Sequence, residues 1–460
     1  MITPAQENER MLARILGIGE EEAADRLART VAITAGEGEA AAFGQELAAQ
    51  LERTITIAGP GDACDLEVTI HAAPTHEAEH RISVALHGDR VIIGIGPTIR
   101  GDAPPSPLHG VQRVIAACYA ASVVLSRLID GIAPTETPDP FVVCFDALGA
   151  NPEVLSTPVR LADTVLAGAG AVGNGFLRAA RHLDISGMLT VVDPKVVGGG
   201  NPNRCLYFNP DDVGAPKAER LCRNAAADFP RLTLTPETVT FSELVKRTGT
   251  VRRVIIGTDS RQARRSIQND LPFEVLDAST TGVAEVIVHS HRQPNHDACL
   301  SCIYRFIPDE RARQQAIAEG LGIALDVVLA GDLIDANVAA NIAARHPGLN
   351  ASALIGMAFD SLYKQLCAQQ ALLTAAGEQV LAPFAFVSNL AGALLALELA
   401  RVEAGARFAD GRNYLFTSPW SPPGARMRRT HSRVPDCSFC SKPETNIALR
   451  TVWPETALPV

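Results

Sequence analysis

Four cysteines form two pairs that have the spacing of metal ligands. The pairs are Cys299-Leu-Ser-Cys302 and Cys437-Ser-Phe-Cys440, in a chain with ten cysteines. Two residues between the cysteines let both thiolates of a pair face one tetrahedral ion, and two such pairs complete a closed structural site. Two unrelated pairs of reduced thiols are the alternative. In a reducing compartment the pattern favours zinc over redox chemistry or disulfides, so we predict one zinc ion per chain.

A glycine-rich segment has the pattern of a phosphate-binding loop. It reads Gly168-Ala-Gly170-Ala-Val-Gly173, follows a predicted strand and opens a predicted helix. Glycines let backbone N–H groups approach phosphate, and a helix N-terminus favours negative charge. Asp193 ends the next predicted strand, where its carboxylate can accept hydrogen bonds from ribose hydroxyls. These residues predict a nucleotide site, although they alone also suit a nicotinamide-dependent oxidoreductase or a glycine turn without a ligand.

The residues after Asp193 depart from a dinucleotide site. They include Asn201, Arg204 and Lys217, and the whole chain has only five lysines. A dinucleotide needs few cations, whereas attack on an α-phosphate needs fixed positive groups that stabilise the developing charge. The stretches 193–204 and 212–218 resemble the ATP site of the ubiquitin-activating superfamily, which includes the adenylyltransferases of thiamine and molybdopterin biosynthesis. The resemblance covers about residues 160–302 and 380–440.

This resemblance implies roles for individual residues in binding ATP. Asn201 and Arg204 are expected to face the triphosphate, and Lys217 to neutralise phosphate charge from the start of the following helix. Solvated surface charge is the alternative for the two basic residues. The sequence departs from the family pattern at Lys195, where an acidic or amide residue is usual, and at Cys205, where glutamine is usual.

Asp259 follows the predicted strand Arg253–Ile256 at the carboxyl edge of the sheet, where open α/β folds bind ligands. A hard cation that bridges phosphate oxygens prefers a carboxylate and water ligands. The resemblance assigns magnesium to Asp259 and places Arg264 in the same motif. The alternative is that Asp259 caps a helix that begins near Arg261.

A cysteine nucleophile would allow a second reaction step. In the resembling enzymes that conjugate a ubiquitin-like protein, the nucleophile lies in the segment after the first Cys-x-x-Cys pair. Cys367 is the single cysteine there, and Lys364 nearby could lower its pKa. The alternative is that Cys367 is a buried structural cysteine. Cys205, beside the expected ATP site, is the other candidate nucleophile. The remaining cysteines, which we expect to be small core residues, are Cys64, Cys118, Cys144 and Cys222.

The elements that must position these residues divide into two domains. A small α+β domain is expected over residues 1–140: it opens with a polar helical stretch and ends in the proline-rich segment 133–140. Its expected strands are Thr54–Ala58, Leu66–His71, Arg81–Leu86 and Arg90–Ile95, and a helix is expected from about His109 to Ile129.

The second expected domain, residues 141–440, has the α/β pattern of a mostly parallel sheet covered by helices, and the resemblance implies that it is a Rossmann-like adenylation domain. Strands are expected at 164–167, 188–192, 253–256 and 273–276. The Ala-rich region at about 303–379 has few predicted strands and is long enough for an inserted helical element or a mobile loop, and the resemblance implies a crossover insertion. A buried strand and a buried helix over 379–397 and a tail over 441–460 are expected to follow.

Charge and composition restrict the partners. The 41 basic and 51 acidic residues give a formal net charge of −10, which opposes non-specific attraction to nucleic acid or to an anionic membrane. The N-terminus lacks the basic and apolar regions of a signal peptide. We therefore expect a cytoplasmic protein.

The expected function is ATP-dependent activation of a small ubiquitin-like protein. By resemblance, the C-terminal glycine carboxylate of that protein is adenylated and then transferred to Cys367, with a conjugating enzyme downstream and a homodimer as the assembly. The insertion and the N-terminal domain resemble activating enzymes of bacterial ubiquitin-like conjugation operons, for which antiphage defence is a candidate role. A sulfur-carrier adenylyltransferase without a thioester step and a dinucleotide-dependent oxidoreductase are the alternatives.

Overall fold

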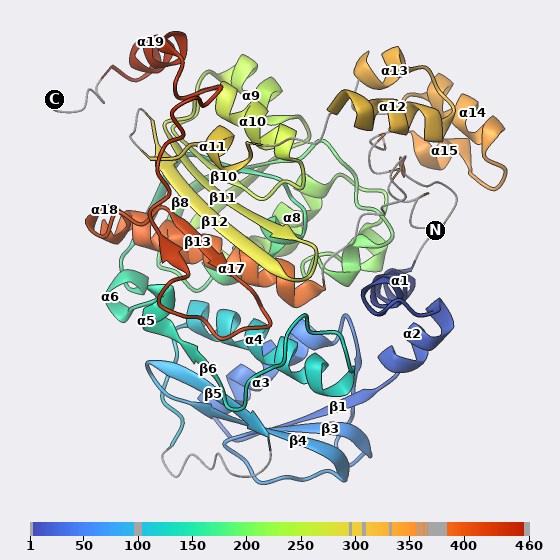
Figure 1. Cartoon of the computed structure of the whole chain (residues 1–460), viewed down its shortest axis with the longest axis vertical. Coiled ribbons are helices and arrows are strands. Elements are labelled where there is room, and N and C mark those ends of the chain that lie inside the picture. The colour runs from blue at the N-terminus through green and yellow to red at the C-terminus, as the bar shows by residue number, and fades with distance from the viewer. Residues whose placement is uncertain are drawn as a thin grey trace.

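Two β-sheets form the framework of the chain, and helices pack between them (Figure 1). The computed structural model describes residues 3–95, 104–293, 297–305, 310–330, 334–355 and 384–454, together with 357, 359, 362, 363 and 366. Helices α3 (Glu39–Leu51) and α4 (Gly110–Leu128) cover the first sheet. Helices α7 (Ala171–Ala180) and α17 (Ala385–Glu403) cover the second sheet, and α17 also packs on α4, so the two domains share one buried layer.

The first sheet has the strand order β2-β1-β3-β4-β5-β6. Neighbouring strands are parallel from β2 to β4 and antiparallel from β4 to β6. The strands are β1 (Thr30–Ala35), β2 (Thr56–Ile57), β3 (Cys64–Ile70), β4 (Ala78–Leu86), β5 (Arg90–Ile95) and β6 (Phe141–Cys144). The mixed sheet and its covering helices confirm the expected N-terminal α+β fold.

Two segments of this sheet differ from the expectation. The stretch before residue 54 is not helical throughout. It consists of α1 (Pro4–Leu16), α2 (Glu20–Leu27), β1 and α3, in that order. The β-branched and small residues of β1 fit a central strand, and Val31 is fully buried there. The sheet also continues past the expected boundary at residue 140, because the apolar residues of β6 pack into the first core, where the rings of Phe141 and Tyr119 lie 5.8 Å apart.

The second sheet has the strand order β14-β13-β12-β11-β10-β7-β8-β9. Its strands are parallel from β11 to β9 and antiparallel from β11 to β14. They are β7 (Val159–Ala167), β8 (Ile185–Val192), β9 (Leu232–Glu237), β10 (Arg253–Ile256), β11 (Glu274–Thr281), β12 (Glu285–Arg292), β13 (Tyr414–Thr417) and β14 (Arg428–Arg429). The four strands expected in this domain therefore form β7, β8, β10 and β11.

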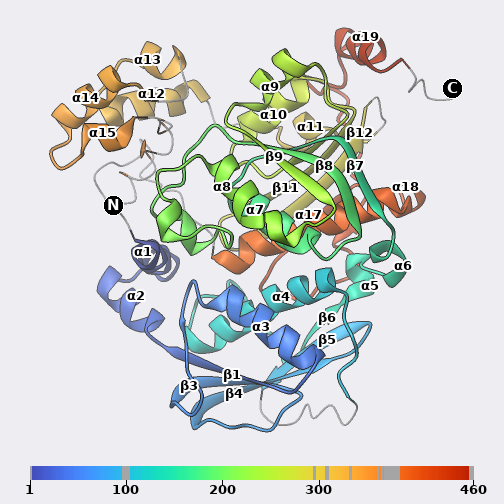
Figure 2. The same ribbon diagram turned by 180° about the vertical axis from the view of Figure 1, so that it is seen from behind.

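Alternate side chains of the central strand β7 point into two different apolar cores, one on each face of the sheet. Val165 and Ala167 of β7 face one core, which contains residues of α9 (Phe241–Thr248) and α10 (Arg261–Asn269). Leu166 faces the core beneath α7 and α17. A strand buried on both faces needs such a continuous apolar run, because helices cover both sides of the parallel sheet. Figure 2 shows α7 and α17 side by side on their face.

Among the described residues, two helices are long and apolar enough to cross a membrane by length and composition. These are α4 and α17, whose most apolar windows are 83% and 100% buried inside the chain. A buried strand and a buried helix were expected over 379–397. The helix is α17, which begins at Ala385, and residues 379–383 lie outside the described residues. The burial of both helices is explained by their position between the two sheets.

The segment after the first cysteine pair forms a separate helical lobe, the insertion, beside the sheet (Figure 1). It consists of α12 (Glu310–Leu321), α13 (Leu325–Ala330), α14 (Ala336–Arg345) and α15 (Ala351–Leu354). The lobe has its own apolar core, which includes Leu321, Ile342 and Phe359. The remaining helices of four or more residues are α5 (Phe145–Leu148), α6 (Pro152–Leu155), α8 (Lys217–Ala225), α11 (Leu300–Ile303), α18 (Ala406–Ala409) and α19 (Pro443–Val452).

Candidate functional site

The glycine-rich loop lies at the point where the strand order of the second sheet reverses. From β7 the chain proceeds outward to β8 and β9 and then returns to β10 on the other side of β7. Gly168 follows β7 with a φ of +106°, and a Cβ there would lie 2.9 Å from the carbonyl carbon of Gly257, which follows β10. Such a crevice beyond the carboxyl ends of parallel strands is where open α/β sheets bind ligands.

The other two glycines of the loop have different surroundings. A Cβ on Gly173 would lie 2.2 Å from the carbonyl oxygen of Gly168, so only glycine lets the helix start so close to the strand. Gly170 is the N-cap residue of α7, and a Cβ there would meet no atom within 4 Å. The open space beside Gly170 is where a phosphate could approach the helix N-terminus.

Asp193 follows β8 and is 7% exposed. Its Oδ2 accepts a hydrogen bond from the N–H of Ala169 at 2.9 Å, and its Oδ1 accepts one from the N–H of Lys195 at 2.8 Å. The carboxylate therefore holds the glycine-rich loop against the end of the neighbouring strand. Because a carboxylate oxygen can accept two hydrogen bonds, this anchoring is compatible with the expected bonds to ribose.

Lys217 is the first residue of α8, and its N–H donates to the carbonyl oxygen of Lys195 at 2.9 Å. Burial lowers the pKa of Lys217, the carboxylate of Asp193 opposes this shift, and the ammonium of Lys195 adds to it. The ammonium Nζ of Lys195 lies 3.6 Å from Oδ1 of Asp259. Two lysines and two carboxylates from separate segments thus lie close enough to influence one another electrostatically.

Asp259 has a side chain that is 59% exposed. The N-cap acceptor of α10 is the neighbouring residue, because Oγ of Ser260 accepts a hydrogen bond from the N–H of Ala263 at 3.2 Å. The side chain of Ser260 therefore meets the capping requirement of α10. An accessible carboxylate at the crevice fits a hard divalent cation that keeps several water ligands.

Arg204 and Asn201 lie in the turn after β8. Oδ1 of Asn201 accepts a hydrogen bond from the N–H of Gly198 at 2.8 Å. The Nη1 group of Arg204 donates to Oε1 of Glu7 at 2.7 Å and to Oδ1 of Asn203 at 2.8 Å. Burial acts to lower the pKa of Arg204, but the nearby Glu7 raises it, and the net shift is upward. The guanidinium is thus a fixed cation that α1 partly neutralises.

Arg264, which the resemblance places in the same motif as Asp259, has a buried side chain. Its Nε donates to Oδ1 of Asp277 at 2.7 Å, and its Nη2 donates to the carbonyl oxygen of Ala278 at 2.9 Å. The hydroxyl of Tyr304 donates to the other oxygen of Asp277, and all three side chains are buried. Arg264 therefore joins α10 to β11 inside the protein, and its guanidinium is engaged away from the exposed Asp259.

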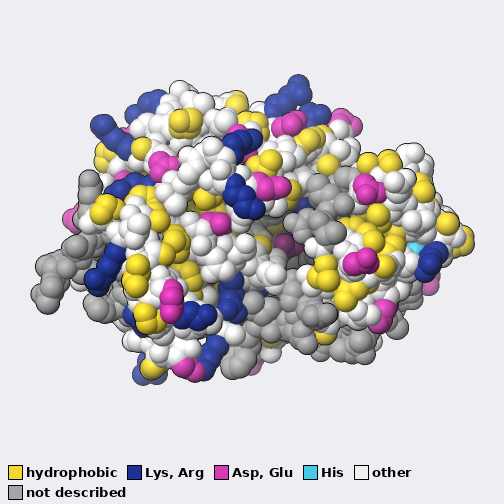
Figure 3. Space-filling model, turned by 90° about the horizontal axis from the view of Figure 1, so that it is seen from above, with side chains coloured by type: hydrophobic (Ala, Val, Ile, Leu, Met, Phe, Trp, Pro, Cys, Tyr) yellow, Lys and Arg dark blue, Asp and Glu magenta, His cyan; other side chains and the backbone are white. Residues whose placement is uncertain are grey.

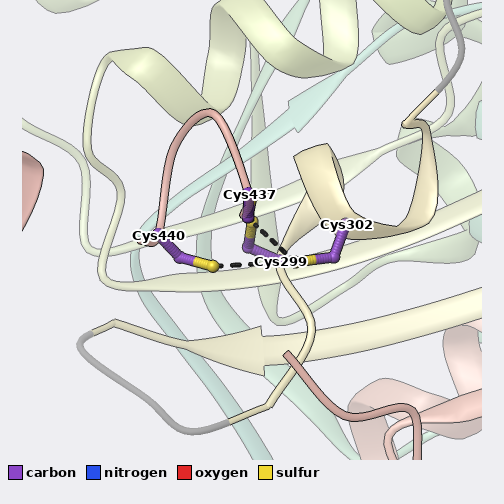
Figure 4. Close-up of side chains that lie close together, drawn as sticks. All are labelled: Cys299, Cys302, Cys437 and Cys440. Carbon is purple, nitrogen blue, oxygen red and sulfur yellow. Dashed lines mark hydrogen bonds between the residues drawn. The ribbon is translucent and has the colours of Figure 1, made fainter. Parts of the chain in front are cut away.

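The four cysteines of the two pairs converge (Figure 4). Cys299 caps α11, Cys302 lies within it, and Cys437 and Cys440 come from a loop near the end of the described chain. The Sγ separations are 3.7 Å for 299–302, 3.6 Å for 299–437 and 3.6 Å for 302–440, and all four atoms lie within 4.8 Å of one another. A tetrahedral zinc ion with bonds of about 2.3 Å requires sulfur separations of about 3.8 Å, so the donor set fits this ion.

The expected nucleophile, Cys367, lies outside the described residues, as does Lys364. The residues before it that are described, Leu362, Tyr363 and Leu366, are buried in the core of the insertion. The rival Cys205 is 1% exposed, and burial raises the pKa of its thiol to about 11. Cys205 therefore has neither the access nor the thiolate character of a nucleophile in this structure.

Two residues at the crevice were not among the expected ligands. Glu7 comes from a helix far away in the sequence, and its spacing to the other site residues has no local pattern that could identify it. Lys195 could have been identified from the sequence, because it is one of only five lysines and follows Asp193 closely.

Comparison with known proteins assigns two parts of the chain to protein families. Residues 1–151 match the E1 N-terminal domain family, and residues 157–439 match the ThiF family. The uncharacterised protein y4jF of Sinorhizobium fredii (strain NBRC 101917 / NGR234) is 31% identical over 263 residues, which are 54% of this chain and 50% of that protein. The match thus spans about half the length of this relative.

Among solved structures, E. coli MccB with MccA-N7isoASN aligns with 78% of this chain and 97% of its own, at 13% identity and a TM-score of 0.37. The ThiF match covers more than half of the chain and contains the glycine-rich loop, the basic residues and three of the four clustered cysteines; it ends one residue before Cys440. The chain therefore belongs to the ThiF family of the ubiquitin-activating superfamily and carries an E1 N-terminal domain.

Proposed function

We propose that this protein activates a small ubiquitin-like protein by adenylating its C-terminal carboxylate with ATP. The observation that carries this proposal is the convergence of Arg204, Lys217 and Asp259 around the crevice beside the glycine-rich loop. Two fixed cations and an accessible carboxylate suit a triphosphate better than a dinucleotide, because charge develops on the α-phosphate during transfer. The ThiF family match supports the same reaction class over a dinucleotide-dependent oxidoreductase.

In the first step, a carboxylate oxygen of the carrier attacks the α-phosphorus of ATP. The new bond joins this oxygen to phosphorus, the bond from phosphorus to the bridging oxygen of the β-phosphate breaks, and pyrophosphate leaves with the electron pair. Arg204 and Lys217 stabilise the charge on the phosphate oxygens. Asp259 would hold a magnesium ion, which would supply further neutralisation of the triphosphate charge.

In the second step, the thiolate of Cys367 attacks the carbonyl carbon of the acyl-adenylate and AMP leaves. The product is a thioester between the carrier and the insertion. The support for this step is the insertion itself, which has its own core and contains the residues that precede Cys367. A sulfur-carrier adenylyltransferase would share the first step without requiring the second.

We propose zinc as a structural ion at the four cysteines. The cluster joins α11 to the loop 437–440, so its expected role is to hold the chain end on the sheet. The partners that we propose are a carrier with a C-terminal glycine, a conjugating enzyme and a second copy of this chain. Basic and acidic side chains are interspersed on the face shown in Figure 3, which supports protein partners over nucleic acid.

The test is ATP–pyrophosphate exchange with a small β-grasp protein encoded beside this gene. We expect exchange that requires the C-terminal glycine of the carrier, together with a protein adduct that survives denaturation but not thiol reductant. Exchange without such an adduct would favour the sulfur-carrier reaction. No exchange with any neighbouring β-grasp protein, in the presence of magnesium, would contradict adenylation of such a carrier.

A further inference from the structure

The backbone of Lys195 is hydrogen bonded to two residues of the proposed ATP site, Asp193 and Lys217. Its N–H donates to Oδ1 of Asp193, and its carbonyl oxygen accepts from the N–H of Lys217. The adjoining bridge between Val196 and Pro216 holds the two segments together. The backbone position of Lys195 is therefore determined by the same contacts that shape the site.

The side chain of Lys195 extends toward Asp259, the residue that we propose for magnesium binding. Its Nζ lies 3.6 Å from Oδ1 of Asp259, and the side chain is 26% exposed. The ammonium also lies close enough to Lys217 to lower the pKa of that residue. A lysine on a flexible four-carbon stem can exchange one anionic partner for another nearby.

We propose that Lys195 is a further catalytic residue of the adenylation, which pairs with Asp259 before ATP binds and contacts the triphosphate afterwards. The inference rests on the proposed function. A divalent cation at Asp259 would lie next to the ammonium, and like charges repel at such distances. The nearest anion to which the ammonium can then turn is the triphosphate, where it joins Lys217 and Arg204.

This arrangement has two consequences of opposite sign. Removing the ammonium deprives the triphosphate of a cation, so ATP should bind more weakly by on the order of tenfold. The same change frees Asp259 from its ion pair, so a divalent cation should bind there more tightly, by about two- to fivefold for a partly exposed pair. A residue with a merely structural role would weaken both together.

The experiment compares Lys195→Met with Lys195→Arg, which keeps the charge, and with Lys246→Met, which removes an exposed lysine of α9. ATP binding is measured by calorimetry at saturating magnesium, and the magnesium concentration for half-maximal exchange is measured at fixed ATP. Thermal unfolding shows whether each variant is folded. We expect weaker ATP binding and a lower magnesium requirement for Lys195→Met, near-normal values for Lys195→Arg and no change for Lys246→Met.

The outcomes separate this inference from the proposed function. If the unchanged protein neither binds ATP nor exchanges pyrophosphate, both fail. Suppose instead that the unchanged protein binds ATP and exchanges pyrophosphate. A folded Lys195→Met variant with unchanged ATP affinity, or with weaker binding of both ATP and magnesium, then overturns only the inference about Lys195. Opposite shifts in the two affinities support it.

Discussion

The carboxylate of Glu7 in the first helix accepts a hydrogen bond from the guanidinium of Arg204 at 2.7 Å, across the boundary between the two domains. A Cβ on Gly200 would lie 1.5 Å from the other carboxylate oxygen of Glu7, so a side chain there could not coexist with this contact. Beside it, the buried amides of Asn8 and Asn203 are hydrogen bonded at 3.2 Å. Helix α1 is thus packed against the arginine that we propose for phosphate binding.

Glu7→Gln should lower the KM for ATP. The carboxylate competes with phosphate for the guanidinium, whereas the amide keeps an oxygen acceptor and removes the charge. For a partly exposed pair we expect an effect of about two- to fivefold. Exchange kinetics at varied ATP measure it, with Glu9→Gln on the same helix as the control. A higher KM would mean instead that Glu7 orients Arg204 for binding.

Asp259→Ala should abolish exchange and leave the stability nearly unchanged, because its side chain is 59% exposed and contributes little to packing. Ser260→Ala should show the reverse pattern: loss of the helix cap should cost about 1 kcal/mol of unfolding free energy, with exchange retained. Denaturant unfolding and exchange at saturating magnesium test both variants. Retained exchange in Asp259→Ala would remove the metal role from this residue.

Cys437→Ser should remove bound zinc and destabilise the protein. Three thiolates no longer complete a closed tetrahedral site, and loss of a structural metal is among the changes that cost more than about 3 kcal/mol. Elemental analysis and thermal unfolding provide the readout. Cys144→Ser, a partly exposed cysteine outside the cluster, should retain one zinc per chain. If the protein without substitutions contained no zinc, and all four thiols could be alkylated, the site would be disproved.

Cys367→Ala should separate the two proposed half-reactions. Adenylation needs only the nucleotide site and the carboxylate of the carrier, so exchange should persist. Thioester formation needs a nucleophile, so the reductant-sensitive adduct should disappear. Gel analysis with and without thiol reductant measures the adduct, and Cys144→Ala is the control. If Cys367→Ala still forms the adduct, another cysteine is the nucleophile.

Local patterns in the sequence predicted a large part of the fold. The glycine-rich loop and the strand before it are consecutive, so their spacing alone predicted β7, the turn and α7. The cysteine pairs were recognisable for the same reason, since two residues between thiolates determine their mutual distance. Continuous apolar runs likewise identified the buried strands β8 and β10.

The tertiary structure decided which of these segments meet and what each side chain contacts. Arg264 lies five residues after Asp259, yet a helix turns it into the protein toward Asp277. Glu7 reaches Arg204, and Lys195 reaches Asp259, only because the packing of α1 and the order of the strands bring distant segments to one edge. Residue types and spacing determine local geometry, whereas contacts between distant segments depend on how sheets and helices bury their apolar faces together. That burial is a property of the whole chain.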